Sequence, residues 1–165
     1  MSLALYSPED VTILLGGIYQ IEGLQEGSFL SISKDEDLFK IAVSTDGVVS
    51  RTHISSPTFT IKMTLSSVAD SNAILTAMAA LDSKTYGVAI PLFIKDGNGT
   101  SLFYAATCWI EKIAEATFSE DVEDRQWTLR ATGVTNVIGG NSFGGIVDTG
   151  LAAAGMISAD FAGLI

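Results

Sequence analysis

The sequence predicts a mainly β protein, an antiparallel β-sandwich or partial barrel with one flanking α-helix. Short β-prone runs recur along the chain, and one alanine-rich stretch between them follows helical spacing instead. The 16 glycines, set against 3 prolines, are typical of many tight turns. A chain of 165 residues can bury one core. We expect a β domain over residues 1–138 and a Gly/Ala-rich extension over residues 139–165.

The first part of the chain contains apolar and β-branched runs that predict strands. Residues 11–21 form such a run, and Gly16-Gly17 is expected to mark a bulge or bend within it. Residues 29–33 follow two turn glycines and predict a second strand. Residues 58–65 alternate strictly, with apolar side chains on one face and threonine or lysine on the other, which predicts a half-buried strand.

A β-hairpin is predicted between these strands. Residues 38–44 and 48–54 are both β-prone, and Asp46-Gly47 between them is a strong short-range hairpin signal. The second arm contains the only histidine of the chain, His53.

The helix is expected over residues 67–81. Four apolar residues recur there at helical spacing: Ile74, Leu75, Met78 and Leu81. Ser67, Asp70 or Ser71 is available as the N-cap, and Gly87 is expected to end the element. The strands expected after the helix span residues 88–95, 101–112, 116–118, 122–131 and 134–138.

The expected extension over residues 139–165 has no basic residue. Its apolar residues recur at i, i+3 and i+4: Val147, Leu151, Ala154, Ile157, Phe161 and Leu164. This spacing predicts a glycine-rich linker followed by a weak amphipathic helix that needs a surface to lie on. We expect that surface to be the outside of the protein or a neighbouring subunit.

Composition excludes several classes of protein. The formal net charge of −10 argues against a chain that binds nucleic acid, because phosphate binding relies on Lys and Arg. The single Cys108 excludes an internal disulfide framework. We recognise no secretory signal and no apolar run long enough for a spanning helix, so no membrane contact is expected. The low charged fraction, 17%, favours extensive subunit contacts.

Three chemical motifs fail on inspection. Residues 96–100 (DGNGT) resemble part of a calcium loop, but the flanking ligand positions hold Ile94 and Ala105, so a plain turn is expected. Residues 140–144 (GNSFG) match a nucleophile elbow, yet the only histidine lies upstream and no βαβ pattern exists. A lone His53 without further ligands does not make a metal site, and Cys108 is expected to be a buried, inert thiol. We predict no catalytic, cofactor or metal site.

Two acidic clusters have more than one interpretation. The first is Asp35, Glu36 and Asp37; the second is Glu111, Glu115, Glu120, Asp121, Glu123 and Asp124. Either cluster is consistent with a solvated surface or with a charge-lined functional surface. Paired carboxylates for glycoside hydrolysis are a more distant alternative, because they require an aromatic cleft.

Several short stretches resemble the tail tube proteins of contractile-tailed bacteriophages. They are YSPEDV (6–11), SKDED (33–37), DGVVSRT (46–52), SNAIL (71–75), IKDGNGTSLF (94–103), WIEK (109–112) and RQWTL (125–129). Their order and spacing together carry the resemblance, which covers roughly residues 5–138.

The resemblance implies a β-sandwich or partial barrel with one flanking helix, assembled into stacked hexameric rings. It implies a hollow tube that carries the genome through a contractile tail, in a virion assembled in the cytoplasm of a bacterial host. The implied partners are copies of the chain itself and the sheath, baseplate and tail terminator proteins. The tape-measure protein and DNA would pass through the lumen without specific binding.

The acidic composition fits such a conduit, because a negative lumen repels phosphate. The ring-stacking or lumen candidates are Asp35, Glu36, Asp37, Asp46 and Arg51. The second-rank lumen or interface candidates are Glu120, Asp121, Glu123 and Asp124. Alternatives are a tube subunit of a related contractile injection or secretion system, and a monomeric or dimeric β-barrel module that holds an apolar ligand in an internal cavity. An acid-dependent hydrolase ranks third.

Overall fold

The computed structural model describes residues 6–140, and this part of the chain contains nine strands, one short 3-10 helix and one α-helix. The elements are η1 (Pro8–Asp10), β1 (Val11–Leu15), β2 (Tyr19–Gln20), β3 (Leu30–Lys34), β4 (Phe39–Val43), β5 (Val49–His53), β6 (Phe59–Ser66), α1 (Ser71–Thr85), β7 (Ile90–Asp96), β8 (Leu102–Lys112) and β9 (Asp124–Val137). The predicted mainly β class with one α-helix is confirmed for these residues. None of the helices in the described range has the length and apolar character that a membrane crossing demands.

Seven of the strands form one sheet with the order β2-β1-β7-β8-β9-β6-β3, and β4 and β5 form a separate two-stranded sheet. The seven-stranded sheet is open, with β2 and β3 at its ends, so the described residues do not form a closed barrel. The chain divides into two compact units, and β8 and β9 each contribute to both. The expected boundary between residues 1–138 and 139–165 stays a prediction, and residues 141–165 lie outside the described part.

Unit 1 comprises residues 6–21, 91–104 and 135–140 of the described chain. Its strands β1 and β7 pair antiparallel, and their partners Ile13 and Ile94 are both buried. Gly16 and Gly17 adopt φ angles of +65° and +75°, which glycine reaches without steric cost. The expected bulge is therefore a full turn, and it folds β2 back onto β1.

Unit 2 comprises residues 22–90 and 105–134 and contains β3, β6 and α1. The predicted alternation of β6 is confirmed, because Ile61, Met63 and Leu65 have no exposed surface. They pack in a core that also contains buried residues of β9 and α1: Trp127, Leu129, Ala131, Leu75 and Ala79. Gly23 lies close to the turn before α1, since a Cβ at Gly23 would lie 2.3 Å from Cβ of Ala69.

Helix α1 begins and ends four residues later than predicted. The residues before it form turns, in which the Ala69 N–H donates to the Ser66 carbonyl. At its end Tyr86 adopts the left-handed conformation (φ 53°), and its N–H donates to the Asp82 carbonyl. The helix therefore ends at Thr85 with Tyr86 as its C-cap, one residue before the predicted end at Gly87.

Strand β9 corrects the prediction for the end of the chain. The expected strands at 122–131 and 134–138 are one continuous strand, Asp124–Val137, and residues 116–118 form no strand. Gly133 stays within β9 although its φ is +64°, and a Cβ there would lie 3.1 Å from Cβ of Ala106. A glycine that is read as a strand end in the sequence is thus a local distortion inside a strand.

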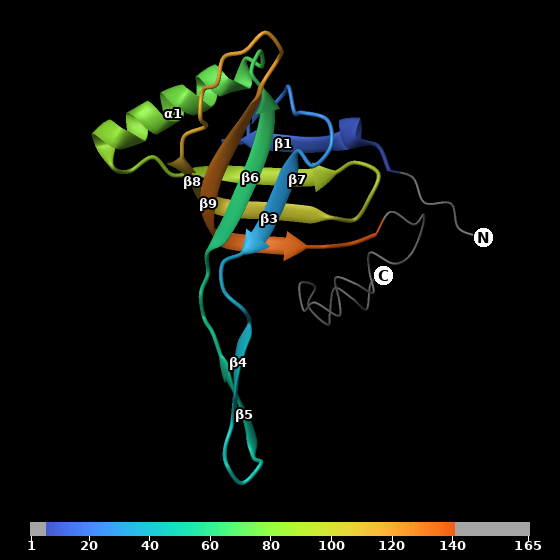
Figure 1. Cartoon of the computed structure of the whole chain (residues 1–165), viewed down its shortest axis with the longest axis vertical. Helices are drawn as coiled ribbons and strands as arrows, with labels where there is room; N and C mark the ends of the chain where they lie inside the picture. Colours follow the sequence, from blue (N-terminus) through green and yellow to red (C-terminus); the bar gives the residue numbers. More distant parts are fainter. Residues whose placement is uncertain (1–5, 141–165) are drawn as a thin grey trace, which may run out of the picture. The chain divides into compact units, whose positions relative to one another are not determined.

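The predicted hairpin is confirmed as β4 and β5, both of which belong to unit 2. It extends away from β3 and β6 as a separate arm (Figure 1). All ten residues of its two strands are exposed.

Candidate functional site

The two faces of the β4–β5 hairpin differ in chemistry. Phe39, Ile41 and Val43 alternate along β4, so they share one face with their register partners on β5: His53, Arg51 and Val49. The four apolar side chains of this face are between 41% and 67% exposed. The opposite face carries small or polar residues: Lys40, Ala42, Ser50 and Thr52. An isolated two-stranded hairpin is marginally stable in water, so a partner that covered this apolar face would stabilise the hairpin.

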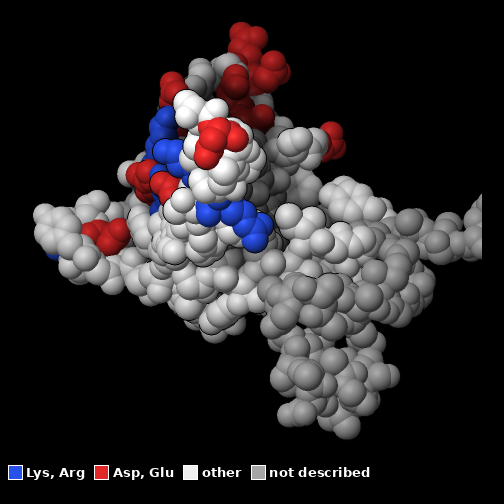
Figure 2. All heavy atoms as spheres, turned by 90° about the horizontal axis from the view of Figure 1, so that it is seen from below, with Lys and Arg blue, Asp and Glu red and all other residues white. Residues whose placement is uncertain are grey.

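A cationic group completes the apolar face. The Arg51 guanidinium lies over the Phe39 ring, 4.5 Å from its centroid, and the His53 ring meets Phe39 edge-on at 5.4 Å. Figure 2 views the molecule from the side of the hairpin. Basic and acidic side chains lie close together in this view and do not form a face of one sign. The sequence candidate Arg51 stands on this apolar face, and His53 contributes a ring contact to it.

Asp46 closes the turn of the hairpin. Its Oδ1 accepts hydrogen bonds from the Ser44 hydroxyl at 2.5 Å and from the Val48 N–H at 3.5 Å. The Ser44 hydrogen bond, with that from Val48, lowers the pKa of Asp46. Gly47 beside it has φ +84°, the conformation that a tight hairpin turn requires. Asp46 is thus first of all a turn residue.

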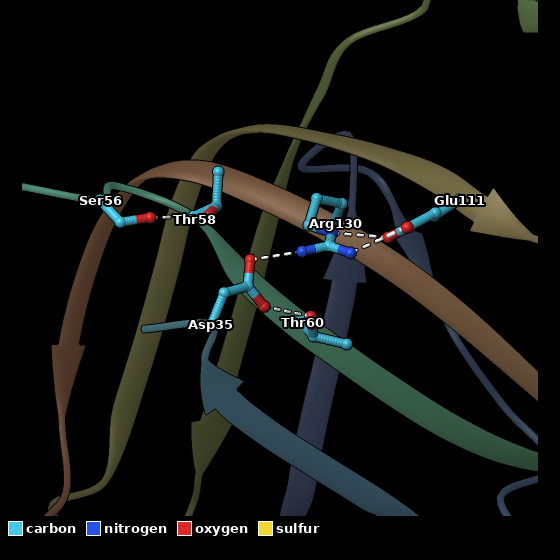
Figure 3. Close-up of polar contacts among 6 residues, drawn as sticks. All are labelled: Asp35, Ser56, Thr58, Thr60, Glu111 and Arg130. Carbon is cyan, nitrogen blue, oxygen red and sulfur yellow. Dashed lines mark hydrogen bonds and ion pairs between the residues drawn. The ribbon is translucent and has the colours of Figure 1, made fainter. Parts of the chain in front are cut away.

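A charge cluster lies where the hairpin leaves the sheet (Figure 3). Arg130 on β9 contacts Asp35, just after β3, through Nη1. The same guanidinium donates to both carboxylate oxygens of Glu111 on β8, at 2.5 Å and 2.8 Å. Asp35 also accepts from the Thr60 hydroxyl of β6. The Arg130–Asp35–Glu111 cluster thereby joins the start of the hairpin segment to three strands of unit 2.

The cluster changes the pKa of each of its members. Partial desolvation raises the pKa of Asp35, but hydrogen bonds from Thr60, Thr58 and Arg130, with the charge of Arg130, outweigh it and lower the pKa overall. The Arg130 hydrogen bonds lower the pKa of Glu111. The pKa of Arg130 rises because the carboxylates of Glu111 and Asp35 accept hydrogen bonds from its guanidinium and stabilise its charged form. All three groups are therefore charged at neutral pH.

The structure separates the first acidic cluster of the sequence. Asp35 is engaged with Arg130, and its side chain is 17% exposed, whereas Glu36 and Asp37 are exposed in the segment between β3 and β4. Sequence reasoning missed Arg130, which lies 95 residues from Asp35. The available signal was the alternation of β9, in which Arg130 stands between buried Leu129 and Ala131 and must face the other side of the sheet.

The second-rank acids lie at the opposite end of unit 2 from the hairpin. In the β6–β9 pair, Phe59 at the hairpin end is opposite Ala131, whereas Ser66 at the other end is opposite Asp124. Glu120, Asp121 and Glu123 precede Asp124 in the loop over residues 113–123, which Figure 1 shows beyond that end of β6. The first- and second-rank candidates are therefore about 23 Å apart along β6 and do not form one patch.

The loop over residues 113–123 combines carboxylates with exposed apolar groups. Phe118 is 86% exposed, and the Arg125 guanidinium lies 5.2 Å from its ring centroid. The Ser119 hydroxyl contacts the Glu123 carboxylate and donates to the Asp121 carbonyl at 3.2 Å. These local hydrogen bonds give the acidic loop a defined shape.

The remaining chemical candidates are placed as follows. In the described part of the chain no group of three or more His, Cys, Asp or Glu side chains is arranged to hold a metal ion. Cys108 is fully buried, and burial raises the pKa of its thiol to about 12. The Asp96 carboxylate accepts from the Asn98 N–H at 3.0 Å, which confirms a plain turn between β7 and β8. The GNSFG stretch extends beyond the described residues.

Comparison with known proteins gives two similarities. The chain is 27% identical to "Structural protein ORF10" of Pseudomonas phage KPP10 over 143 residues, which cover 82% of this chain and 83% of that protein. The resemblance to phage tail proteins is confirmed. The fold resembles that of the tube terminating cap of the anti-feeding prophage, with a TM-score of 0.55, 14% identity, and coverage of 82% and 92% of the two chains. No protein-family model matches the chain.

Proposed function

We propose that the protein is a structural subunit of a phage tail tube, whose copies form hexameric rings that stack into a hollow conduit for the genome. The proposal rests above all on the β4–β5 hairpin, an exposed arm with one apolar face. The similarity to a phage structural protein and the cap-like fold support it. A structural role without catalysis agrees with both comparisons. The sheath, baseplate and tail terminator proteins are the proposed partners, in a virion assembled in the host cytoplasm.

Charge supports a specific stacking contact between rings. The hairpin strands carry Lys40 and Arg51, while the loop over residues 113–123 carries four carboxylates and no basic residue. The hairpin and the loop lie at opposite ends of β6. The hairpin of one copy would therefore meet the acidic loop of a copy in the next ring, with Phe39 and Ile41 covered in the contact. A heterologous contact of this kind repeats without closing, which produces a filament.

The exposed acids are also candidates for surfaces other than the hairpin contact. Glu36, Asp37 and the second-rank acids Glu120, Asp121, Glu123 and Asp124 are the candidates for the lumen or the ring interface. Asp35 and Asp46 act through the Arg130 cluster and the turn, where they fix the hairpin. A negative lumen would let DNA and the tape-measure protein pass without binding.

The decisive experiment is negative-stain electron microscopy of the purified full-length protein, with Ile41→Asp as the test variant. We expect hollow tubes from the unmodified protein and none from Ile41→Asp, because the carboxylate would be buried in the stacking contact. Thr52→Asp, on the opposite face of the hairpin, is the matched control and should still form tubes. The urea midpoint of both variants should stay close to that of the unmodified protein, since both positions are exposed.

Two other results would contradict the tube proposal, and each would favour a different function. Isolated rings that never stack would favour a tube cap, the second candidate, which the structural likeness to a tube terminating cap supports. A compact monomer or dimer by sedimentation would favour a binding module. The groove between α1 and the end of β8, lined by Tyr86, Val88, Trp109 and Ile113 among others, would then be the first place to search for its ligand.

A further inference from the structure

An open groove lies within unit 2, between the end of α1 and the end of β8. Its volume of about 580 Å³ falls in the range of pockets that hold a small organic molecule, so it has room for several side chains. Most of its lining is apolar or aromatic and includes Tyr86, Val88, Trp109, Ile110 and Ile113. Asp82 and Glu111 also line it, and none of the described lining residues is basic. The groove therefore suits a group that is apolar and carries positive charge.

The two carboxylates of the groove differ in their availability. Both oxygens of Glu111 accept hydrogen bonds from Arg130, which balances its charge. Asp82 accepts only through Oδ1, from the Val88 N–H at 3.1 Å, and its Oδ2 accepts nothing from the described residues. Asp82 is thus the lining residue whose carboxylate is free to bind a cation from outside.

Tyr86 at the edge of the groove has a costly backbone conformation. It is the only non-glycine residue of the described chain with a positive φ, 53°, and its side chain is 90% exposed. Glycine would take this position at the helix end without steric cost, so the stability of the fold gives no reason for a tyrosine. An aromatic ring and a free carboxylate in one groove are the groups that bind a guanidinium, which stacks on the ring and donates to the carboxylate.

The β4–β5 hairpin carries the complementary group. Arg51 lies over the Phe39 ring at 4.5 Å, on a face whose apolar side chains are between 41% and 67% exposed. This hairpin extends away as a separate arm and joins β6 at Phe59, whereas α1 follows the other end of β6, at Ser66 (Figure 1). The face is therefore not available to the groove of its own copy, but it is available to that of another.

We propose that this groove receives the apolar face of the β4–β5 hairpin from a second copy of the chain. The Arg51 of that copy contacts Tyr86 and Asp82, and its Phe39 enters the groove beside them. The inference rests on the proposed stacking of copies and names the surface that receives the hairpin. The groove borders the loop over residues 113–123, whose first residue lines it, so one hairpin can touch both.

Disulfide cross-linking of the full-length Ile41→Cys/Ser83→Cys variant tests the inference. Ile41 stands on the apolar face of the hairpin, Ser83 lines the groove, and both are exposed. Native Cys108 is buried and should form no cross-links in the folded protein. Because the two cysteines lie on different surfaces, a repeated contact should give a ladder of oligomers on a non-reducing gel and not dimers alone.

Two comparison variants locate the contact. Thr52→Cys/Ser83→Cys moves the hairpin cysteine to the opposite face and should give no ladder. Ile41→Cys/Ser119→Cys places the second cysteine in the acidic loop. A ladder from the Ser119 variant alone would overturn the groove assignment and leave the stacking of rings intact. Tubes of the unmodified protein without a ladder from either Ile41 variant would also overturn it, whereas the absence of both tubes and ladders would contradict the proposed function as well.

A Tyr86→Gly change in the Ile41→Cys/Ser83→Cys chain separates the contact from folding. The urea midpoint should stay the same or rise, because glycine adopts the left-handed conformation freely. The loss of the stacked ring should raise the protein concentration needed for the ladder by about fivefold. Asp82→Asn is the second change, since its amide oxygen still accepts from the Val88 N–H while the charge is lost, and it should weaken the ladder similarly. Unchanged cross-linking in both would overturn the inference.

Discussion

At the scale of single residues, Arg130 connects the base of the hairpin to the sheet. It joins carboxylates from two other parts of unit 2, and one of them, Asp35, begins the segment that leads into the hairpin. A single exposed ion pair contributes little to the free energy of unfolding. We therefore expect the cluster to act mainly by holding the chain in place where it leaves β3.

Replacing Arg130 with methionine should destabilise the protein at neutral pH and much less in acid. The folded-state pKa values of Asp35 and Glu111 are lowered, so their stabilisation is present above their unfolded pKa values and is lost as the pH falls through the folded ones. The destabilisation caused by the Arg130→Met change should therefore become smaller as the pH falls below about 4. Urea midpoints measured from pH 3 to pH 7 check this, with Arg125→Met as the control on the same strand. A midpoint difference that is the same at both pH extremes would contradict the assignment.

Cys108 is predicted to be unreactive in the folded chain. It has no exposed surface, and the pKa of its thiol is raised to about 12, so neither access nor the thiolate form is available at pH 8. A chromogenic thiol reagent should react only as fast as the protein unfolds, and the rate should rise with urea in parallel with loss of the circular dichroism signal. Immediate stoichiometric reaction without denaturant would show that β8 is not buried there.

At the scale of elements, α1 is held to the sheet by a polar contact within an apolar layer. The Trp127 Nε1–H of β9 donates to Oδ1 of Asn72 at 2.9 Å, and Nδ2 of Asn72 donates to the Ser66 and Ala69 carbonyls at 2.8 and 3.0 Å. The Asn72 side chain thus provides an acceptor for the indole N–H of buried Trp127 and donors for two backbone carbonyls that precede the helix.

Replacing Asn72 with leucine should lower the free energy of unfolding by about 1–3 kcal/mol, because the buried Trp127 N–H loses its acceptor. Urea unfolding followed by tryptophan fluorescence measures the change. Thr76→Ala, one turn later on the helix and exposed, is the control and should cost much less. If the two variants unfolded at the same urea concentration, the Asn72 contact would carry no stability.

At the scale of the whole molecule, the net charge of −10 is the property that most limits what the protein can bind. Lys40 and Arg51 of the hairpin strands and the carboxylates of the 113–123 loop lie at opposite ends of unit 2, and the proposed stacking contact would pair these groups between copies. In the proposed tube, the remaining excess of acid would repel phosphate polymers.

The protein should therefore not retain short double-stranded DNA at physiological salt, as measured by electrophoretic mobility. Replacing Glu120, Asp121, Glu123 and Asp124 together with lysine should produce binding that weakens as salt is raised. The matched control replaces the same four residues with Gln or Asn, which removes repulsion without adding attraction and should bind little. Tight DNA binding by the unmodified protein would contradict a non-adhesive conduit.

Several local elements of this protein are predictable from near neighbours in the sequence. The strict alternation of residues 58–65 gave β6, and the Asp46-Gly47 pair gave the hairpin, because side-chain periodicity and turn conformation depend on near neighbours only. Tertiary structure decided what requires distant partners. The continuity of β9 through Gly133 depends on pairing with other strands, and Asp35 meets Arg130 across 95 residues. The hairpin was therefore predictable as an element, whereas its exposure as a separate arm and the charge cluster at its base were not.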